Sequence, residues 1–406
     1  MGIRVLYLAH DLADPAIRRR VLMLVAGGAE VMLAGFRRDS NALAAVEGIQ
    51  PIELGLTADG RFGQRASAVI KAAFGVRRML GHLPRPDVIL ARNLEMLAVG
   101  RRARHAFGAP VPLVYECLDI HRLVLREDGL GKALRALEGR LSRQASLLIT
   151  SSPAFVEHYF HRLSSVDLPV MLMENKVLDL SGESMPSLNA RRPAAGQPWR
   201  IGWFGALRCA RSFDALAAFS RAMQGRVQIE LRGRPAYGVM PDFDARVAAE
   251  PYMTFHGAYR NPEDLARIYG EVQFAWAIDF YEEGQNSDWL LPNRLYESCR
   301  HGALPIALSG TETGRTLQRH GLGFCIETAG VEALSALFET MTGSAYDEAF
   351  AALAAADARL FTADAGDCRA LVERLRTLPD LSTRLKPSPA DVKPYSPSIN
   401  VDVHDG

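Results

Sequence analysis

The sequence contains few cysteines, and those it has are isolated from one another. Five occur in 406 residues, and none forms a Cys-x-x-Cys pair. An odd, scattered set is typical of reduced thiols, which favours a cytoplasmic protein over a disulfide-bonded secreted one. Long apolar runs are missing as well: the sequence has no run of about 18 apolar residues that could span a membrane, and no apolar core of signal-peptide length. We therefore expect a cytoplasmic protein without a membrane-spanning segment.

Familiar motifs for phosphate, metal and nucleic acid are also absent. The turn after the first expected strand, His10–Pro15, lacks the Gly-x-Gly-x-x-Gly pattern of dinucleotide-binding folds, and there is no Walker P-loop. No Asp-x-Asp pair stands between apolar runs, so a metal-bound diphosphate is not indicated, and we expect neither a metal site nor a cofactor. Without zinc-ligand spacing, a lysine-rich tail or an RNA-binding aromatic signature, nucleic acid is not an expected partner.

Charge is unevenly distributed along the chain. Residues 1–176 carry 24 Lys and Arg against 17 Asp and Glu, whereas the remainder carries 23 against 29. A basic first half suggests an anionic partner, and an anionic membrane surface fits that role. The clearest candidate for this contact is residues 61–83, an amphipathic segment whose only charges are basic.

This segment has two possible interpretations. Its apolar side chains are expected near one face, and its basic side chains on others. It either packs into the core with a solvated basic face, or it contacts acidic lipid headgroups. The apolar set is Phe62, Val69, Ala73, Val76 and Leu80, and the basic set is Arg65, Lys71, Arg77 and Arg78.

Strand and helix patterns alternate through most of the chain, and this alternation predicts parallel sheets. A stretch rich in Ser, Pro, Gly and Ala interrupts the pattern once, and 406 residues are too many for one core. We predict an α/β fold with two doubly wound, Rossmann-like domains that face each other across a cleft. The predicted parts are an N-terminal domain at 1–178, a linker at 179–198, a C-terminal domain at 199–360, a C-terminal helix at 361–379 packing back toward the N-terminal domain, and a disordered tail at 380–406.

The second half contains two stretches suited to binding a nucleoside diphosphate. In Trp289–Leu308, a helix is expected to begin after Pro292, and its N-terminus can receive a phosphate while Glu297 accepts hydrogen bonds from a sugar diol. In Gly205–Arg211, a glycine turn between a strand and a helix carries Arg208 and Arg211, which can share a diphosphate. The loop from His256 to Tyr259 is then assigned to the base.

These features together resemble the GT-B fold glycosyltransferases of the family 4 type, including the succinoglycan glucosyltransferase group of bacterial exopolysaccharide assembly. The resemblance covers about residues 3–375. It is carried by IGWFGALR (201–208), the Gly257–Tyr259 loop, NRLYE (293–297) with GALPIA (302–307), and HGLGF (320–324).

The resemblance implies that Glu297 binds the donor ribose and that Arg208 and Arg211 bind the diphosphate, within a nucleotide-sugar-binding C-terminal domain opposite an acceptor-binding N-terminal domain. The predicted donor-binding residues are Gly205, Arg208, Arg211, His256, Tyr259, Asn286, Trp289, Asn293, Arg294 and Glu297.

Two positions depart from the family pattern. The family pairs two glutamates with seven residues between them, but the earlier position here is Trp289. The histidine that retaining members place in the first domain is matched by Leu118 in YECLDIH. Retaining and inverting transfer therefore both stay open. For an inverting displacement, Asp119 is the candidate general base and Glu116 the next candidate; a structural role of Asp119 in its loop is the alternative.

We accordingly expect a glycosyltransferase that moves a sugar from a UDP- or GDP-linked donor to a lipid-linked saccharide acceptor in exopolysaccharide or cell-surface polysaccharide synthesis. It would act in the cytoplasm, bound peripherally to the inner membrane face. The alternatives are a GT-B nucleotide-sugar epimerase or hydrolase, and a non-catalytic nucleotide-binding component of a polysaccharide-assembly complex.

Overall fold

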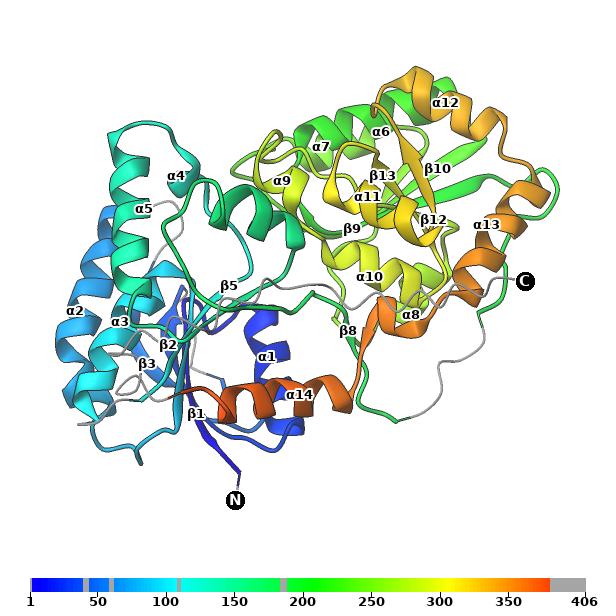
Figure 1. Cartoon of the computed structure of the whole chain (residues 1–406). Helices are drawn as coiled ribbons and strands as arrows, with labels where there is room; N and C mark the ends of the chain where they lie inside the picture. The colour runs from blue at the N-terminus through cyan, green and yellow to red at the C-terminus, as the bar shows by residue number, and fades with distance from the viewer. Residues whose placement is uncertain (1, 39–43, 58–61, 108–110, 183–187, 380–406) are drawn as a thin grey trace.

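The structure, a computed structural model, describes residues 2–38, 44–57, 62–107, 111–182 and 188–379. The tail predicted at 380–406 lies outside these residues. Two parallel sheets with flanking helices stand side by side, one formed by the first half of the chain and one by the second (Figure 1).

The N-terminal half contains a seven-stranded parallel sheet in the order β3-β2-β1-β4-β5-β6-β7. Its strands are β1 (Arg4–Ala9), β2 (Glu30–Arg37), β3 (Ile52–Leu56), β4 (Val88–Arg92), β5 (Leu113–Cys117), β6 (Leu147–Thr150) and β7 (Val170–Leu172). Its helices are α1 (Pro15–Ala26), α2 (Phe62–Leu80), α3 (Asn93–Ala106), α4 (Arg122–Leu125), α5 (Gly129–Ser142) and the π-helix η1 (Phe155–Phe160). Every residue of β4 and β5 is buried, as helices on both faces of a parallel sheet require.

The C-terminal half contains a six-stranded parallel sheet in the order β11-β10-β9-β12-β13-β14. Its strands are β9 (Trp199–Leu207), β10 (Val227–Pro235), β11 (Met253–Phe255), β12 (Phe274–Trp276), β13 (Leu304–Leu308) and β14 (Phe324–Ile326). Its helices are α6 (Ala210–Ala222), α7 (Phe243–Ala248), α8 (Leu265–Gly270), α9 (Asn286–Trp289), α10 (Asn293–Arg300), α11 (Glu312–His320), α12 (Val331–Glu339), α13 (Gly343–Ala355) and the 3-10 turn η2 (Ala358–Leu360).

Both sheets reverse their strand order once, between β1 and β4 in the first half and between β9 and β12 in the second. In open parallel sheets, ligands bind beyond the carboxyl ends of the strands at such a switch point. The two switch points therefore identify where a functional site is expected in each half.

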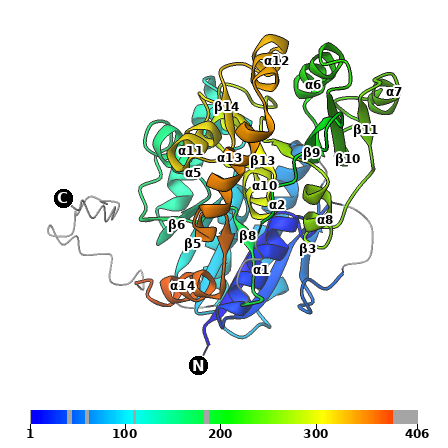
Figure 2. The same ribbon diagram turned by 90° about the vertical axis from the view of Figure 1, so that its right-hand side faces the viewer.

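The chain crosses between the halves twice. On the outward crossing it forms β8 (Val177–Leu178), and on the return β15 (Thr362–Ala363), and these two short strands pair in parallel. The return leads into α14 (Ala365–Arg376), which lies along α1 at the bottom of both views (Figures 1 and 2). Although α14 follows the second half in sequence, it is thus part of the first half.

Packing between α1 and α14 is close. Cys368, Leu371 and Val372 belong to the same buried cluster as Ile17 and other apolar side chains of α1 and β1. At the end of α1, a Cβ atom on Gly27 would lie 2.3 Å from the carbonyl oxygen of Cys368. Glycine is required at this position because the two helices leave no space for a side chain.

Helix α2 confirms the predicted amphipathic segment as a helix. From the predicted apolar set, Val76 and Leu80 are buried together with Ala72, and Val69 packs partly buried against the same cluster. Ile70 and Phe74, which were not in that set, are 57% and 74% exposed, so the helix also has a second, uncovered apolar side. Among the described residues, no helix has both the length and the apolar character needed to cross a bilayer.

Candidate active site

The end of β9 supplies the glycine turn at the second switch point. Gly205 has φ +112°, a backbone conformation that side-chain-bearing residues rarely adopt. A Cβ atom there would lie 4.0 Å from the hydroxyl of Tyr259, so the loop after β11 closes over this turn. Gly205 and Tyr259, two predicted donor-binding residues, are thereby brought together.

Arg208 and Arg211 follow this turn and contact the loop after β12. The guanidinium of Arg208 lies 3.6 Å from Asp279 and over the ring of Tyr281, and its side chain is 39% exposed. It therefore stands across the switch point between β9 and β12. Arg211 is more exposed, pairs with Glu283 and stacks on Phe280. Arg208 is the better placed of the two to meet a ligand at the strand ends, since Arg211 is directed toward the protein surface.

Glu297 is held in a polar environment one turn into α10. Its Oε1 accepts a 2.9 Å hydrogen bond from the Asn261 amide, and its Oε2 accepts one of 3.0 Å from the hydroxyl of Tyr269. Burial raises the pKa of Glu297, although these hydrogen bonds and the charges of Arg19 and Arg294 oppose that effect. Within the described part of the chain, each carboxylate oxygen accepts one hydrogen bond, which leaves each able to accept another from a ligand diol.

The remaining predicted donor residues of this half lie around the same strand ends. Asn293 is exposed at the first position of α10, and Arg294 donates to the carbonyl of Ile278, 3.4 Å away. His256 follows β11, and its Nε2 lies 2.6 Å from Glu230 Oε2. His256 is thus already engaged within its own half.

Asn286 and Trp289 contact the opposite half of the molecule. The Asn286 side chain is 2% exposed and donates a 2.7 Å hydrogen bond to Asp119 Oδ1. The Trp289 ring stacks on His158 with 5.6 Å between the ring centroids. The structure gives each of these two residues a partner in the N-terminal half, and their predicted role in donor binding stays a prediction.

Asp119 lies in the loop after β5, where it meets the C-terminal half. Its side chain is accessible to solvent, and within the described residues its Oδ2 accepts no hydrogen bond. Burial by the surrounding protein raises its pKa, while the hydrogen bond from Asn286 and the positive charge of Arg208 oppose the rise. A carboxylate with one free oxygen and a raised pKa has the properties of a general base.

Glu116 is not available for this role, and its prediction as a catalytic candidate is corrected here. Its side chain is 0% exposed, and it accepts hydrogen bonds from Arg20 Nε at 2.6 Å and from the Tyr7 hydroxyl at 2.7 Å. Burial would raise the pKa of Glu116, but the charges of Arg20 and Arg92 lower it. A substrate hydroxyl cannot reach this carboxylate, which instead balances two buried arginines.

Several site residues were missed by the sequence analysis. Arg19 of α1 donates a hydrogen bond to Asn175, and its positive charge acts to lower the pKa of Glu297. Arg18 donates to the carbonyl of Asn261, 3.4 Å away. The available signal was a run of three arginines in the helix that follows the first strand, beside the first switch point.

Glu282 is a further acidic residue that the sequence did not distinguish from its neighbours. Burial raises its pKa, and the charge of Asp119 raises it further, so the two carboxylates face each other from opposite halves. Within the described residues, no group of three or more His, Cys, Asp or Glu side chains is arranged to hold a metal ion. The expectation of a reaction without a metal ion stays a prediction.

Comparison with solved structures identifies the fold class. The chain superimposes on Alr3699/HepE of Anabaena, solved in complex with UDP and glucose, with a TM-score of 0.63 and 15% identity, covering 92% of this chain and 99% of that one. It superimposes on sucrose-phosphate synthase of Thermosynechococcus elongatus with a TM-score of 0.65 and 14% identity, covering 94% and 96%. Two Rossmann-like sheets in this arrangement define the GT-B fold, which confirms the predicted fold class.

Sequence comparison then gives the family. Residues 1–170 match the model described as a glycosyl transferase 4-like domain. The chain is 59% identical over 378 residues to the succinoglycan biosynthesis protein ExoL of Rhizobium meliloti (strain 1021), covering 93% of this chain and 94% of ExoL. The chain belongs to the glycosyl transferase 4-like family and is a glycosyltransferase.

Proposed function

We propose that this glycosyltransferase moves a sugar from a UDP- or GDP-linked donor to a lipid-linked saccharide during assembly of succinoglycan or a related exopolysaccharide. The 59% identity to a succinoglycan biosynthesis protein supports the pathway. The observation that carries the donor assignment is Glu297, which retains hydrogen-bonding capacity on both oxygens at the same strand ends as Arg208.

In the proposed donor site, three elements bind different parts of the nucleotide. Glu297 accepts hydrogen bonds from the ribose diol, and Tyr259 lies against the turn of Gly205, where backbone N–H groups can approach a phosphate. Arg208 exchanges its ion pair with Asp279 for the diphosphate, which carries more negative charge.

The proposed transfer is an inverting displacement with Asp119 as general base. Asp119 removes the proton from the acceptor hydroxyl as the oxygen forms a bond to the anomeric carbon of the donor sugar. The bond from that carbon to the diphosphate oxygen breaks, and the departing diphosphate is stabilised by Arg208 and by the α10 N-terminus.

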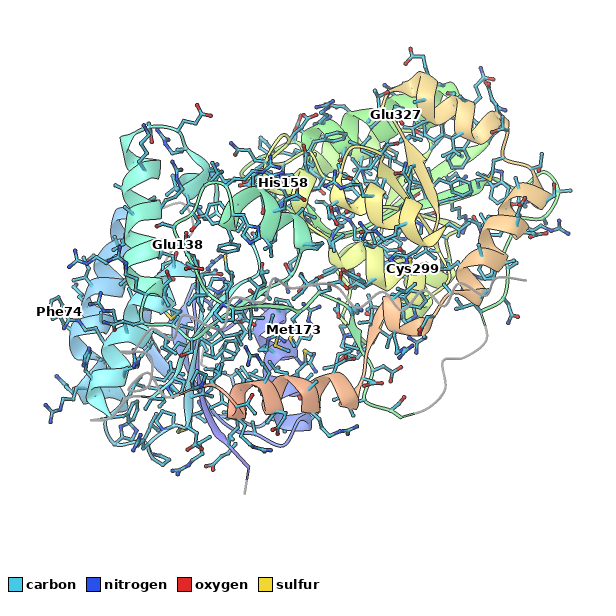
Figure 3. The ribbon with its side chains drawn as sticks, viewed as in Figure 1. Phe74, Glu138, His158, Met173, Cys299 and Glu327 are labelled. Atoms are coloured by element: carbon cyan, nitrogen blue, oxygen red, sulfur yellow. The ribbon has the colours of Figure 1, made fainter. Side chains whose placement is uncertain are left out.

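We propose that the first half docks on the inner face of the membrane and reaches the lipid-linked acceptor there. Ile70 and Phe74 of α2 are uncovered apolar side chains, and Lys71, Arg77 and Arg78 beside them are exposed. Phe74 points outward at the edge of the first half, away from the second (Figure 3). Apolar insertion together with attraction to anionic headgroups supports peripheral binding.

Donor binding is tested with a panel of nucleotides and nucleotide sugars on the purified protein. UDP or GDP and one of their sugar conjugates should raise the melting temperature. Glu297→Gln should weaken binding of that ligand roughly tenfold or more, because a neutral amide replaces a charged acceptor. Glu339→Gln, on an exposed position of α12, is the matched control and should bind normally.

Two outcomes would contradict the proposal. If no UDP- or GDP-linked compound stabilises the protein, the donor class is wrong. If a ligand binds but Glu297→Gln and Arg208→Ala retain its full affinity, the donor site lies elsewhere.

A further inference from the structure

A short segment of the second half packs against the first half. It comprises residues 286–290, which are α9 and the residue after it. Trp289 and Leu290 pack against the apolar cluster beneath β4 and β5, although they belong in sequence to the nucleotide-binding half. His158, the stacking partner of Trp289, lies at the junction of the two halves in Figure 3.

Polar contacts attach this segment to both halves. The hydroxyl of Ser152, at the end of β6, donates a hydrogen bond to the carbonyl of Trp289. On the other side, the hydroxyl of Thr313 in α11 donates a 3.1 Å hydrogen bond to the carbonyl of Leu290. The segment therefore connects α11 with the loops at the carboxyl ends of β5 and β6.

This docking gives the side-chain amide of Asn286 its hydrogen-bond partners in the first half. Its Oδ1 accepts the backbone N–H of Ile120 at 3.1 Å, and its Nδ2 donates to Asp119 Oδ1 at 2.7 Å. It is also hydrogen-bonded to Glu282. One buried side chain thus joins the base loop of the first half to the acidic loop of the second. If the halves separated, the Asn286 amide would lose two partners and Asp119 would lose its hydrogen-bond donor.

We propose that residues 286–290 form a latch between the two halves, and that Asn286 is a positioning residue that holds Asp119 only when the latch is docked. The catalytic part of this inference rests on the proposed function, whereas the latch itself does not. The nucleotide-binding half then contributes to the acceptor side of the reaction by orienting the base, in addition to binding the donor.

Charged groups from several elements surround Asp119 and influence its pKa, as does the hydrogen bond from Asn286. Arg208, His121, Arg92 and Glu282 face it from different elements, and Arg122 faces Glu282. The N–H group of Asn286 stabilises the charged carboxylate, so loss of that hydrogen bond raises the pKa of Asp119 further. Undocking therefore leaves the base without the hydrogen bond that orients its carboxylate.

Hydrogen exchange of the full-length protein without ligand tests the latch. Asn286→Ala should accelerate exchange of the backbone N–H of Ile120 by tenfold or more, because that N–H loses its acceptor. Trp289→Ala should accelerate exchange in the same peptide and in the peptide containing Ser152. Trp289→Phe, which keeps an aromatic ring against His158, should preserve the protection. Glu339→Gln, at an exposed position of α12, is the control and should leave both peptides unchanged.

A pH series separates positioning of Asp119 from a purely structural contact. After correction for the intrinsic rate, protection of Ile120 in the wild type should fall as the pH drops through the pKa of Asp119, since the neutral carboxyl holds Asn286 less tightly. Asn286→Ala should lack this pH dependence.

Unchanged exchange in both Asn286→Ala and Trp289→Ala would overturn the latch. Protection of Ile120 that is independent of pH in the wild type would overturn the coupling to Asp119. Failure of the proposed function would appear differently, as absent nucleotide binding with the latch results intact.

Discussion

At the scale of single residues, two carboxylates near the end of β5 have opposite surroundings. Glu116 ends in a buried cluster with Tyr7, Arg20 and Arg92, whereas Asp119 reaches solvent at the junction of the halves. The side chains differ by one methylene group, so the different roles proposed for them rest on their surroundings.

Asp119→Asn should lower kcat/KM by about a hundredfold or more, because an amide cannot accept the proton of the acceptor hydroxyl. In the wild type, kcat/KM should fall as the pH drops through the pKa of Asp119, which lies above the ordinary value of an aspartate because of burial. Initial rates of sugar transfer measured across pH check both statements. A variant with wild-type rates and an unchanged pH profile would reject Asp119 as the base.

Glu116→Gln should destabilise the fold by about 3–5 kcal/mol, because two buried arginines lose their countercharge. Since the folded pKa of Glu116 is lowered, its stabilising contribution is present above the unfolded value, about 4.3, and is lost as the pH falls through the folded value. Urea unfolding at pH 7 and at a series of pH values below 4 measures both effects. A variant as stable as the wild type at pH 7 would contradict the buried ion-pair assignment.

How far single residues could be predicted from the sequence depended on the range of their contacts. Glu297 and Arg208 could be put forward as donor-binding candidates because a strand, a turn and a helix N-terminus are local patterns. The partners of Asn286 lie 166 and 167 positions away, in the other half of the chain. Nothing local distinguishes a side chain that binds a ligand from one that bridges two sheets.

At the scale of elements, α2 shows what a periodic pattern predicts and what it leaves open. The pattern gave a helix with basic charges, and the structure has one. Which apolar side chains are covered is decided by the neighbouring α3 and the sheet, against which Ala72, Val76 and Leu80 pack. Ile70 and Phe74 remain uncovered, and the guanidinium of Arg102 lies 5.3 Å from the Phe74 ring.

Phe74→Ala should weaken binding to vesicles containing anionic lipid roughly tenfold, because one large apolar side chain no longer inserts. Reversing the charges of Arg77 and Arg78 together should weaken it further, by about 1 kcal/mol or more for each residue. Vesicle co-sedimentation at two salt concentrations measures both changes. Arg369→Glu, at an exposed position of α14, is the control. Binding that is equal in all variants and insensitive to salt would contradict docking through α2.

At the scale of the whole molecule, two doubly wound sheets follow from the alternation of strands and helices, which short connections and right-handed crossovers convert into parallel sheets. The relative placement of the sheets did not follow from any pattern. It depends on the β8–β15 pair, on the docking of Trp289 and on α14, all of which join segments far apart in the sequence.

Leu371→Ala should destabilise the first half by about 2–5 kcal/mol, because this side chain of α14 is fully buried against α1 and β1. Chemical unfolding of the full chain measures the loss, and Arg369→Ala on the exposed side of the same helix is the control. If both variants unfold at the same denaturant concentration as the wild type, α14 does not contribute to the core of the first half.

The return of α14 to α1 also affects how the protein is made. During synthesis, the first 178 residues emerge from the ribosome long before the segment at 365–376 has been made. In the nascent first half, Ile17, Val21 and Leu24 therefore lack the α14 side chains that later cover them. Domains usually fold in order as they emerge during synthesis. In this protein the half that is synthesised first is completed last, because its α1 surface stays uncovered until α14 has been synthesised.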